Sequence, residues 1–247
     1  MKFYTLAAVG FSPGLLLISA QDNFDSSNYD YEDDEPDLKK FSAIMDMTYS
    51  KIQFQSPGTK WSAAVFQTRI TQYGCHCFLG SSRAAGGKGV PVNELDDACR
   101  TLYRCKKCVS MDTPQGCDVD HDKYKYTFNS ADGSIDCSAN DNKCKLTTCK
   151  CDAQFAAEVA DFWDDAKWDD FYWGHRANRK NPNGVYDYDN TCIASGQSIE
   201  PNNCCGKNPF RYPYNDQEKS CCAKSGKLYN EVTSECCKDG SVQASCP

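Results

Sequence analysis

The amino-acid sequence predicts a mainly α, disulfide-rich protein with a small cysteine-rich tail, and three observations support this class. The 247 residues include 18 cysteines but 3 histidines, which favours a disulfide framework over zinc sites. Two stretches, 93–107 and 144–173, combine helical spacing with cysteines. Pairs of adjacent cysteines replace this pattern beyond Asn190. Because an apolar content of 40% is low for one large core, we expect disulfides to supply much of the stability.

The N-terminus predicts secretion. Lys2 precedes an apolar run from Phe3 to Ile18, and Ala20 is the small residue that a signal peptidase requires. We therefore expect a signal peptide over residues 1–20 and an extracellular mature protein. No later apolar run approaches the roughly 18 residues of a membrane span, so no transmembrane segment is expected.

Net charge and local charge patterns limit the partners. The net charge of −7 argues against nucleic acid and against strong attraction to anionic membranes. Residues 21–37 are rich in Asp and Glu and cannot bury enough apolar surface to fold alone. We expect a solvated, disordered segment there; the alternatives are a propeptide or a weak calcium attractor.

Three helices are expected between residues 38 and 173. The first runs from Leu38 to Thr48, and residues 52–72 are predicted to be a loop with one short turn. The second begins after Asn93, which can cap it, with Asp96 at the third helical position. The third begins near Cys144 and is expected to reach about Trp173. A short hairpin with strands at 124–126 and 135–137 is expected before the third helix.

The third predicted helix carries a wide aromatic side and an acidic side. Its apolar stripe and additional aromatics comprise Phe155, Val159, Phe162, Trp163, Ala166, Trp168, Phe171, Tyr172 and Trp173. Such a face could enter a membrane interface. The acidic residues would be repelled by anionic lipid, so packing against the cysteine-rich tail is the favoured interpretation.

The stretch from Tyr73 to Cys108 carries a specific order of motifs. It begins with YGCHC, continues through a Gly-rich loop and ends in PVNELDDACRTLYRCKKC. It resembles the calcium loop and first long helix of secreted phospholipase A2, where a Tyr-Gly-Cys-x-Cys-Gly turn precedes Pro-x-x-x-Leu-Asp-x-Cys-Cys-x-x-His-Asp-x-Cys. A second signature, CKLTTCKCD at Cys144–Asp152, resembles the start of the family's partner helix. The resemblance implies a phospholipase A2-like core of two antiparallel disulfide-linked helices with a small β-hairpin.

The resemblance also implies a set of disulfides. Carried over from the family, the pairs are Cys77 with Cys99, Cys105 with Cys151, Cys117 with Cys144 and Cys137 with Cys149. Cys75 then needs a partner late in the chain, and Cys192 is the nearest in role. One further family bridge would join positions 98 and 158, where this chain has Ala98 and Glu158. Cys108 is left with the tail cysteines, and we infer that it tethers the tail to the core.

The tail contains an internal repeat. Tyr214-Asn215 precedes Cys221-Cys222 by the same interval as Tyr229-Asn230 precedes Cys236-Cys237. Units of this size cannot bury a core alone, so we expect disulfides to hold them to one another. The repeat weakly resembles those of galaxin-type extracellular matrix proteins.

The catalytic positions of the family are altered. In the family a His accepts a proton from water, an Asp orients that His, and calcium polarises the ester. Leu102 and Tyr103 stand at the positions of the catalytic His and the calcium-binding Asp, whereas Asp152 retains the orienting Asp. No intact catalytic set is therefore expected, and we expect Asp152 to be buried and paired with Lys106.

The calcium loop also departs from the family pattern. Its remnant comprises His76, Phe78, Gly86, Gly87 and Gly89, with Phe78 in place of a glycine. About six residues within Leu79–Ala85 lengthen the loop. No metal or cofactor is therefore expected, with Ca²⁺ only under the enzymatic alternative below. His76, His121 and His175 are each expected to be surface histidines.

These observations favour a secreted, catalytically inactive phospholipase A2-like binding or extracellular-matrix protein. Its expected partners are phospholipid or matrix and mineral, or another protein. The first alternative is an active calcium-dependent phospholipase A2 that hydrolyses the sn-2 ester of glycerophospholipids, with His121-Asp122 supplying the dipeptide. The second is a toxin or inhibitor subunit that pairs with an active homologue. The expected organisation is a signal peptide at 1–20, an acidic segment at 21–37, a phospholipase A2-like domain at 38–192 and a di-cysteine extension at 193–247.

Overall fold

The computed structural model describes most of the chain beyond residue 37. The described residues are 38–58, 66, 69–71, 73–77, 87–113, 116–119, 123–164, 168–171, 187–194 and 199–247. All of them belong to one compact unit, Pro36–Pro247. The expected signal peptide and acidic segment lie outside them. Among the described helices, none is both long enough and apolar enough to cross a membrane.

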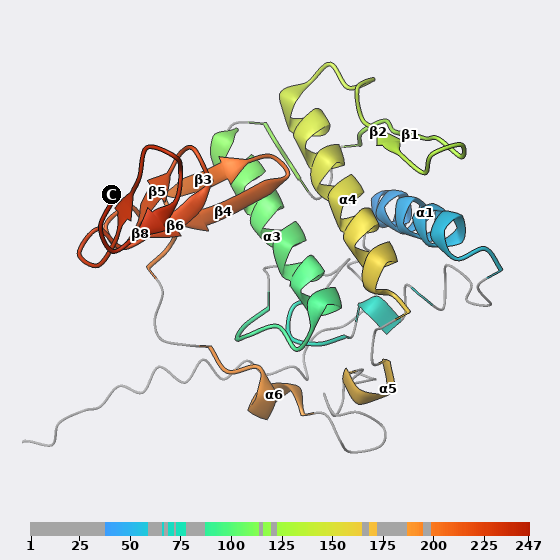
Figure 1. Cartoon of the computed structure of the whole chain (residues 1–247). Coiled ribbons are helices and arrows are strands. Elements are labelled where there is room, and N and C mark those ends of the chain that lie inside the picture. Colours follow the sequence, from blue (N-terminus) through green and yellow to red (C-terminus); the bar gives the residue numbers. More distant parts are fainter. Residues whose placement is uncertain are drawn as a thin grey trace, which may run out of the picture. The chain divides into compact units, whose positions relative to one another are not determined.

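Three long helices form the core of this unit. They are α1 (Leu38–Gln55), α3 (Glu94–Asp112) and α4 (Lys143–Phe162). α4 packs against both α1 and α3, and it runs antiparallel to α3 (Figure 1). The resemblance stated above implied this pair of antiparallel helices, and the Cys105–Cys151 disulfide joins them.

α1 is longer than the sequence predicted. It ends at Gln55, whereas the sequence placed its end near Thr48 and a loop from residue 52. Ile44, Thr48 and Ile52 recur at intervals of four, and all three side chains are buried. Burial of Ile52 against the other helices therefore accompanies an extension of the helix by about two turns beyond the predicted end.

Asparagine side chains begin both α3 and α4. The side-chain oxygen of Asn93 accepts a hydrogen bond from the amide of Asp96 at 3.1 Å, as the sequence predicted. At α4, the side-chain oxygen of Asn142 accepts from the amide of Cys144 at 2.7 Å. Each cap satisfies an amide that has no partner within its own helix.

The prediction that α4 continues to Trp173 is wrong. α4 ends at Phe162, and a separate short helix, α5, spans Trp168–Phe171. Trp163, just after α4, is buried and packs edge-to-face on Phe66 with ring centroids 6.1 Å apart. Ala166 and Trp173 lie outside the described residues.

The aromatic side of the third predicted helix was expected to pack on the tail. Its described residue Phe171 packs on the core instead. The Phe171 ring packs edge-to-face on Tyr73, with centroids 6.1 Å apart. Its backbone carbonyl also accepts a hydrogen bond from the Gly74 amide at 3.0 Å. α5 is therefore attached to the Cys-x-Cys turn of the core. The side chains of Trp168 and Tyr172 lie outside the described residues.

A small hairpin precedes α4. Its strands are β1 (Thr127–Phe128) and β2 (Ile135–Asp136), which pair antiparallel. The first strand therefore begins after the predicted 124–126. Asn140 explains the difference, because its side chain binds both the amide and the carbonyl of Lys125, at 2.8 and 2.7 Å. The backbone amide and carbonyl of Lys125 therefore bond to the side chain of Asn140 and not to a neighbouring strand.

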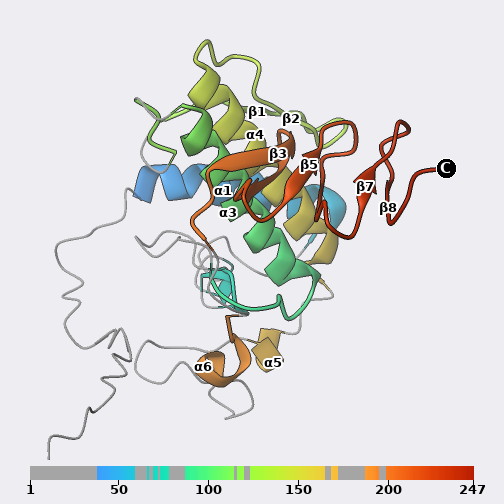
Figure 2. The same ribbon diagram turned by 90° about the vertical axis from the view of Figure 1, so that its left-hand side faces the viewer.

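The tail consists of antiparallel two-stranded hairpins in series (Figure 2). Their strands are β3 (Asn203–Lys207) with β4 (Phe210–Tyr214), β5 (Ser220–Cys222) with β6 (Lys227–Tyr229), and β7 (Glu235–Cys236) with β8 (Val242–Gln243). Disulfides Cys205–Cys221 and Cys222–Cys236 join each hairpin to the next, and Cys237–Cys246 closes the last. The expectation that disulfides hold the repeats together is confirmed.

The internal repeat has a structural cause. The side-chain oxygens of Asn215 and Asn230 each accept a hydrogen bond from the amide two residues later, at 2.9 and 2.8 Å. Each asparagine carbonyl also accepts from an amide four residues later. The two asparagines therefore form the same turn between one hairpin and the next.

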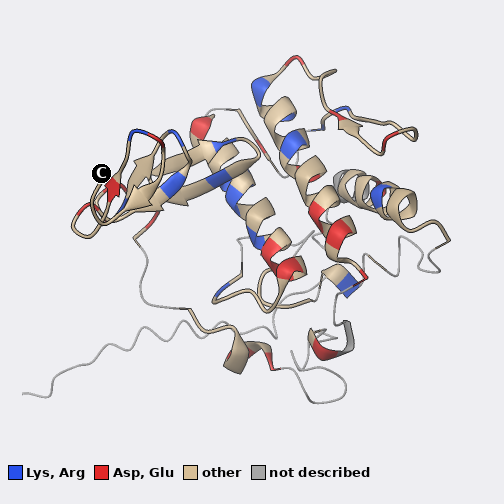
Figure 3. Cartoon of the chain, viewed as in Figure 1, with Lys and Arg blue, Asp and Glu red and all other residues tan. Residues whose placement is uncertain are grey.

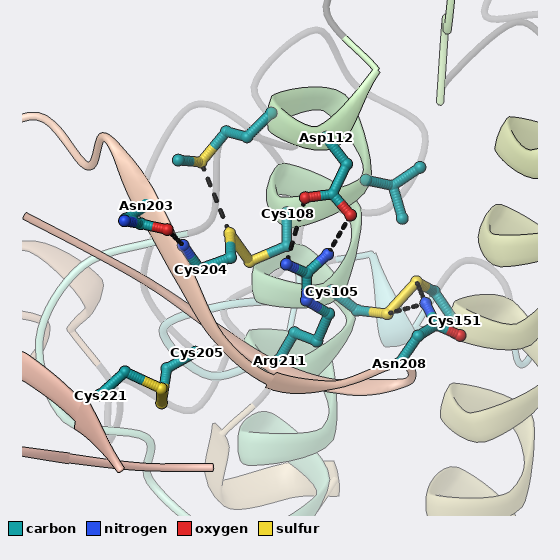
Figure 4. Close-up of a disulfide and its surroundings, with 12 residues drawn as sticks. Cys105, Cys108, Asp112, Cys151, Asn203, Cys204, Cys205, Asn208, Arg211 and Cys221 are labelled. Atoms are coloured by element: carbon teal, nitrogen blue, oxygen red, sulfur yellow. Dashed lines mark hydrogen bonds and ion pairs between the residues drawn. A yellow bond between two sulfur atoms is a disulfide. The ribbon is translucent and has the colours of Figure 1, made fainter. Parts of the chain in front are cut away.

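All 18 cysteines form nine disulfides. The five pairs within residues 75–192 are those that the resemblance implied. Cys108 of α3 pairs with Cys204 of β3, so it tethers the tail as inferred. Next to this bridge, Arg211 of β4 forms two contacts with the carboxylate of Asp112 (Figure 4). The β3–β4 hairpin thus lies along α3, held by a disulfide from β3 and an ion pair from β4.

Candidate functional site: a packed catalytic position

Leu102, which the resemblance aligns with the family's catalytic histidine, lies on the buried face of α3. Its side chain is 3% exposed. It belongs to the same apolar cluster as Ile44 of α1 and as Phe155 and Val159 of α4. The side chain contains only carbon and hydrogen, so it can accept no proton. Its burial contributes about 1.5 to 3 kcal/mol to folding, as expected for a leucine in a core.

Asp152 of α4 is the retained member of the site, and its carboxylate is fully buried. The Tyr124 hydroxyl donates a hydrogen bond to Oδ2 at 2.6 Å. The Lys106 ammonium of α3 lies 3.2 Å from Oδ1. A buried carboxylate without such partners would cost several kcal/mol. The predicted pairing of Asp152 with Lys106 is therefore confirmed.

Sequence reasoning placed Tyr124 in a strand and did not identify it as a member of this site. Burial raises the pKa of Tyr124 far above its usual range, and the negative charge of Asp152 raises it further. The phenol therefore stays protonated and keeps donating to Asp152. No spacing pattern predicts this contact, because Tyr124 precedes the hairpin and reaches Asp152 of α4 across 28 residues.

Asp96 organises the Cys-x-Cys turn. Its buried carboxylate accepts hydrogen bonds from the amides of Cys75 and Val92 at 2.9 and 3.0 Å, and from that of His76 at 2.7 Å. Burial raises the pKa of Asp96, while these amides and the nearby His76 oppose the rise. The sequence identified Asp96 only as part of a helix cap. Gly74 is required beside it, because its φ is +58° and a Cβ there would overlap the carboxylate.

His76 is buried, so the prediction that it is a surface histidine is wrong. Its side chain is 6% exposed, and Nε2 lies 3.1 Å from the backbone oxygen of Gly89. The amide of Lys88 also reaches the carbonyl of Cys75 at 3.3 Å. The Gly87–Gly89 segment thus covers the histidine. Of the predicted calcium-loop remnant, the structure brings His76, Gly87 and Gly89 together, while Phe78 and Gly86 lie outside the described residues.

The described donors do not fit a calcium site of the family type. Ca²⁺ takes six to eight oxygen ligands at about 2.3 to 2.6 Å, usually including carboxylates. Tyr103, which the resemblance aligns with the family's calcium-binding Asp, offers a phenol and no carboxylate. The Gly89 oxygen is engaged by His76, and the Cys75 oxygen by Lys88. In the part of the chain that the structure describes, no cluster of three or more His, Cys, Asp or Glu could hold a metal.

The other histidines cannot be placed in this site. His121 and Asp122, which reproduce the His-Asp dipeptide, lie outside the described residues, as does His175. The structure therefore defines a site made of Leu102 and Lys106 on α3, Asp152 on α4, and Tyr124, which precedes the hairpin. A disulfide-linked pair of antiparallel helices is the core that the resemblance to the phospholipase A2 class implied.

Comparison with known proteins agrees with this class. The model of the Phospholipase A2 family matches residues 52–167. The Group IID secretory phospholipase A2 of Mus musculus is 34% identical over 111 residues, which cover 44% of this chain and 69% of the relative. The chain belongs to the phospholipase A2 family.

Other relatives match shorter parts. "Phospholipase A2, membrane associated" of Mus musculus is 41% identical over 80 residues, or 32% of this chain, and the chain spans 47% of its length. The "Acidic phospholipase A2 homolog textilotoxin D chain" of Pseudonaja textilis is 30% identical over 93 residues, or 36% of this chain and 56% of the relative. The chain therefore spans about half the length of several relatives that it matches. The family match ends before the hairpin tail.

Proposed function

We propose that the chain is a secreted, catalytically inactive member of the phospholipase A2 family that acts as a binding or extracellular-matrix protein. One observation carries the proposal: Leu102, which the resemblance aligns with the catalytic base, is packed into the apolar core. Hydrolysis by the family's route needs a group that takes a proton from water. A leucine cannot serve as that group.

The state of Asp152 supports the same proposal. In the family the equivalent carboxylate orients the catalytic histidine. Here its oxygens are engaged by the Lys106 ammonium and the Tyr124 hydroxyl, and the side chain has no exposed surface. The carboxylate therefore acts as a structural ion pair between α3 and α4.

The binding role is supported by what surrounds this core. The acidic N-terminal residues and the di-cysteine hairpin tail suggest a mineral or matrix partner. Membership of the phospholipase A2 family suggests phospholipid. The tail adds a disulfide-linked surface beyond the matched family segment.

The catalytic part of the proposal is tested by release of fatty acid from mixed phospholipid micelles, with and without calcium. The mouse Group IID secretory phospholipase A2 serves as the comparison enzyme. We expect no calcium-dependent release above the rate without protein. Calcium-dependent turnover that disappears in a His121→Asn variant would establish the enzymatic alternative.

The binding part is tested by co-sedimentation with calcium carbonate and, separately, with phosphatidylcholine vesicles, each at several salt concentrations. Binding to the mineral that weakens as salt rises supports a charge-driven matrix role. Binding to vesicles that persists at high salt supports a lipid role. Failure to sediment with either would contradict the proposed binding function.

A further inference from the structure

A groove lies on the side of α4 that carries Leu146, away from the cluster that contains Leu102. Its volume is about 590 Å³, within the range of about 300 to 1,000 Å³ typical of small-molecule sites. It is lined by α4, by strand β2 with its flanking turns, by Lys51 of α1 and by Pro209 at the turn of the β3–β4 hairpin. Neither the catalytic position nor the Cys-x-Cys turn contributes to it.

The sequence of α4 explains why this groove exists. Leu146, Lys150, Ala153 and Ala157 recur every three or four residues, so they lie on one face of the helix. The two alanines leave space that larger side chains would fill. Ile135 of β2 and Pro209 of the tail stand on the other sides. The groove therefore has apolar surface contributed by three separate elements.

Covalent bonds and hydrogen bonds fix the walls relative to one another. The Cys137–Cys149 disulfide joins the end of β2 to α4. Asn208, just before Pro209, points its side-chain nitrogen at the Cys105–Cys151 disulfide and at the Thr147 carbonyl, 3.4 Å away (Figure 4). A site held in this way loses little conformational entropy when it binds a ligand.

The charges in the groove favour an anion. Lys51 and Lys150 line it, and the Lys51 ammonium is positioned by a 2.8 Å hydrogen bond to the Gly133 carbonyl. Asp136 also lines it; hydrogen bonds from the Ser138 amide and hydroxyl lower the pKa of Asp136, so it is ionised at neutral pH. Two lysines and one aspartate leave one net positive charge, in a chain whose net charge is −7. Basic residues also gather toward the N-terminal half of α4 (Figure 3).

We propose that this groove binds a single-chain amphiphile with a carboxylate head, such as a long-chain fatty acid. The acyl chain lies along Ile135, Leu146, Ala153, Ala157 and Pro209, and the carboxylate contacts the ammonium groups of Lys51 and Lys150. The hairpin tail completes the site through Pro209. The proposal does not depend on whether the chain is catalytically inactive, because the groove shares no residue with the catalytic position.

Binding of the fluorescent fatty acid cis-parinaric acid to the full chain, below the concentration at which it forms micelles, tests the role of charge. We expect the Lys51→Gln/Lys150→Gln variant to bind at least about tenfold more weakly, which corresponds to about 1.4 kcal/mol. The methyl ester of the same acid should lose no affinity in this variant. The matched control, Lys224→Gln/Lys227→Gln, removes two exposed lysines of the tail and should leave binding unchanged. Equal losses in the two lysine variants would contradict the proposal.

The role of shape is tested by filling the groove. Ala153→Leu/Ala157→Leu should weaken binding of both the acid and its ester by at least about tenfold, because the added side chains occupy the space of the acyl chain. Ala223→Leu, at an exposed position of the tail, is the control. Unchanged binding in the filled variant would place the fatty acid elsewhere and overturn the proposal. The lysine variants, whose substitutions lie at surface positions, keep the test valid if the filled variant fails to fold.

Discussion

The helical core and the hairpin tail are both cross-linked by disulfides, but they differ in how much apolar burial accompanies the cross-links. In the core, bridges accompany an apolar cluster drawn from α1, α3 and α4. In residues 203–247 the buried side chains are Cys205, Cys222, Cys237 and Asn215. The tail bridges also close short segments, with separations of 9 to 16 residues. The core therefore combines apolar burial with cross-links, whereas the tail depends on cross-links and turn hydrogen bonds.

The largest effect is expected where a tail bridge is removed. In Cys222→Ser/Cys236→Ser, the β7–β8 hairpin loses its covalent link to β5–β6. An isolated two-stranded hairpin is at best marginally stable in water, so amides of residues 230–247 should lose their protection almost completely. Hydrogen exchange followed by mass spectrometry measures this directly.

The same experiment includes its control. In that variant, amides of α3 and α4 should keep their protection, because the core bridges and the apolar cluster are untouched. Loss of protection throughout the chain would show that core and tail unfold as one unit, contrary to the comparison drawn above.

The next largest effect concerns two neighbouring lysines of α3. Lys106→Met leaves the buried carboxylate of Asp152 without its cation and should cost about 3 to 5 kcal/mol. Lys107→Met removes a partner of Glu200, whose side chain is 80% exposed, and should cost less than about 1 kcal/mol. Denaturant unfolding of the two variants measures the difference. Similar losses would mean that the Asp152 pair does not stabilise the core.

A smaller effect is expected at the junction between core and tail. Arg211 forms two contacts with the Asp112 carboxylate, and the two side chains are 14% and 33% exposed. Removing the pair should cost about 1 kcal/mol or less. A double-mutant cycle with Arg211→Ala and Asp112→Ala isolates this coupling. A coupling energy of zero would mean that the Cys108–Cys204 bridge and packing alone attach the β3–β4 hairpin to α3.

The smallest effect concerns Glu158 of α4 and depends on pH. Burial raises the pKa of Glu158, and Asp97 and Asp161 raise it further, while a hydrogen bond from Gln154 opposes the rise. A carboxyl whose pKa is higher in the folded state contributes stability at low pH that is lost as pH rises through that pKa. Glu158→Gln should therefore raise the melting temperature at neutral pH but not below about pH 4.

The control for this prediction is Glu218→Gln, at an exposed position of the tail. It should leave the pH profile of the melting temperature unchanged. A rise in stability from Glu158→Gln that is equal at every pH would show that the carboxyl charge is not the cause.

Local features were predictable from the sequence. The asparagine cap at Asn93 follows from the residues around it, because a cap and its amide are near neighbours in the chain. The bridge pairs followed from the family resemblance. The pairing of Lys106 with Asp152 followed from the need of a buried carboxylate for a cation.

Features that depend on distant contacts were not predictable. Just after the end of α4, Trp163 packs on Phe66, which is 97 positions earlier by the residue numbers. The burial of His76 depends on where the Gly87–Gly89 segment lies, and the contact of Tyr124 with Asp152 depends on the path of the chain before the hairpin. The groove beside α4 required knowledge that Pro209 lies against the core.

The Cys108–Cys204 bridge has a consequence for proteolytic processing. A single cut of the backbone between Cys192 and Cys204 would not release the tail, because that bridge still joins the two fragments. The Cys75–Cys192 bridge would likewise retain the end of the first fragment. The cleaved protein would migrate as one species on a non-reducing gel and as two after reduction. An extracellular protease could therefore introduce a nick without separating the tail from the rest of the molecule.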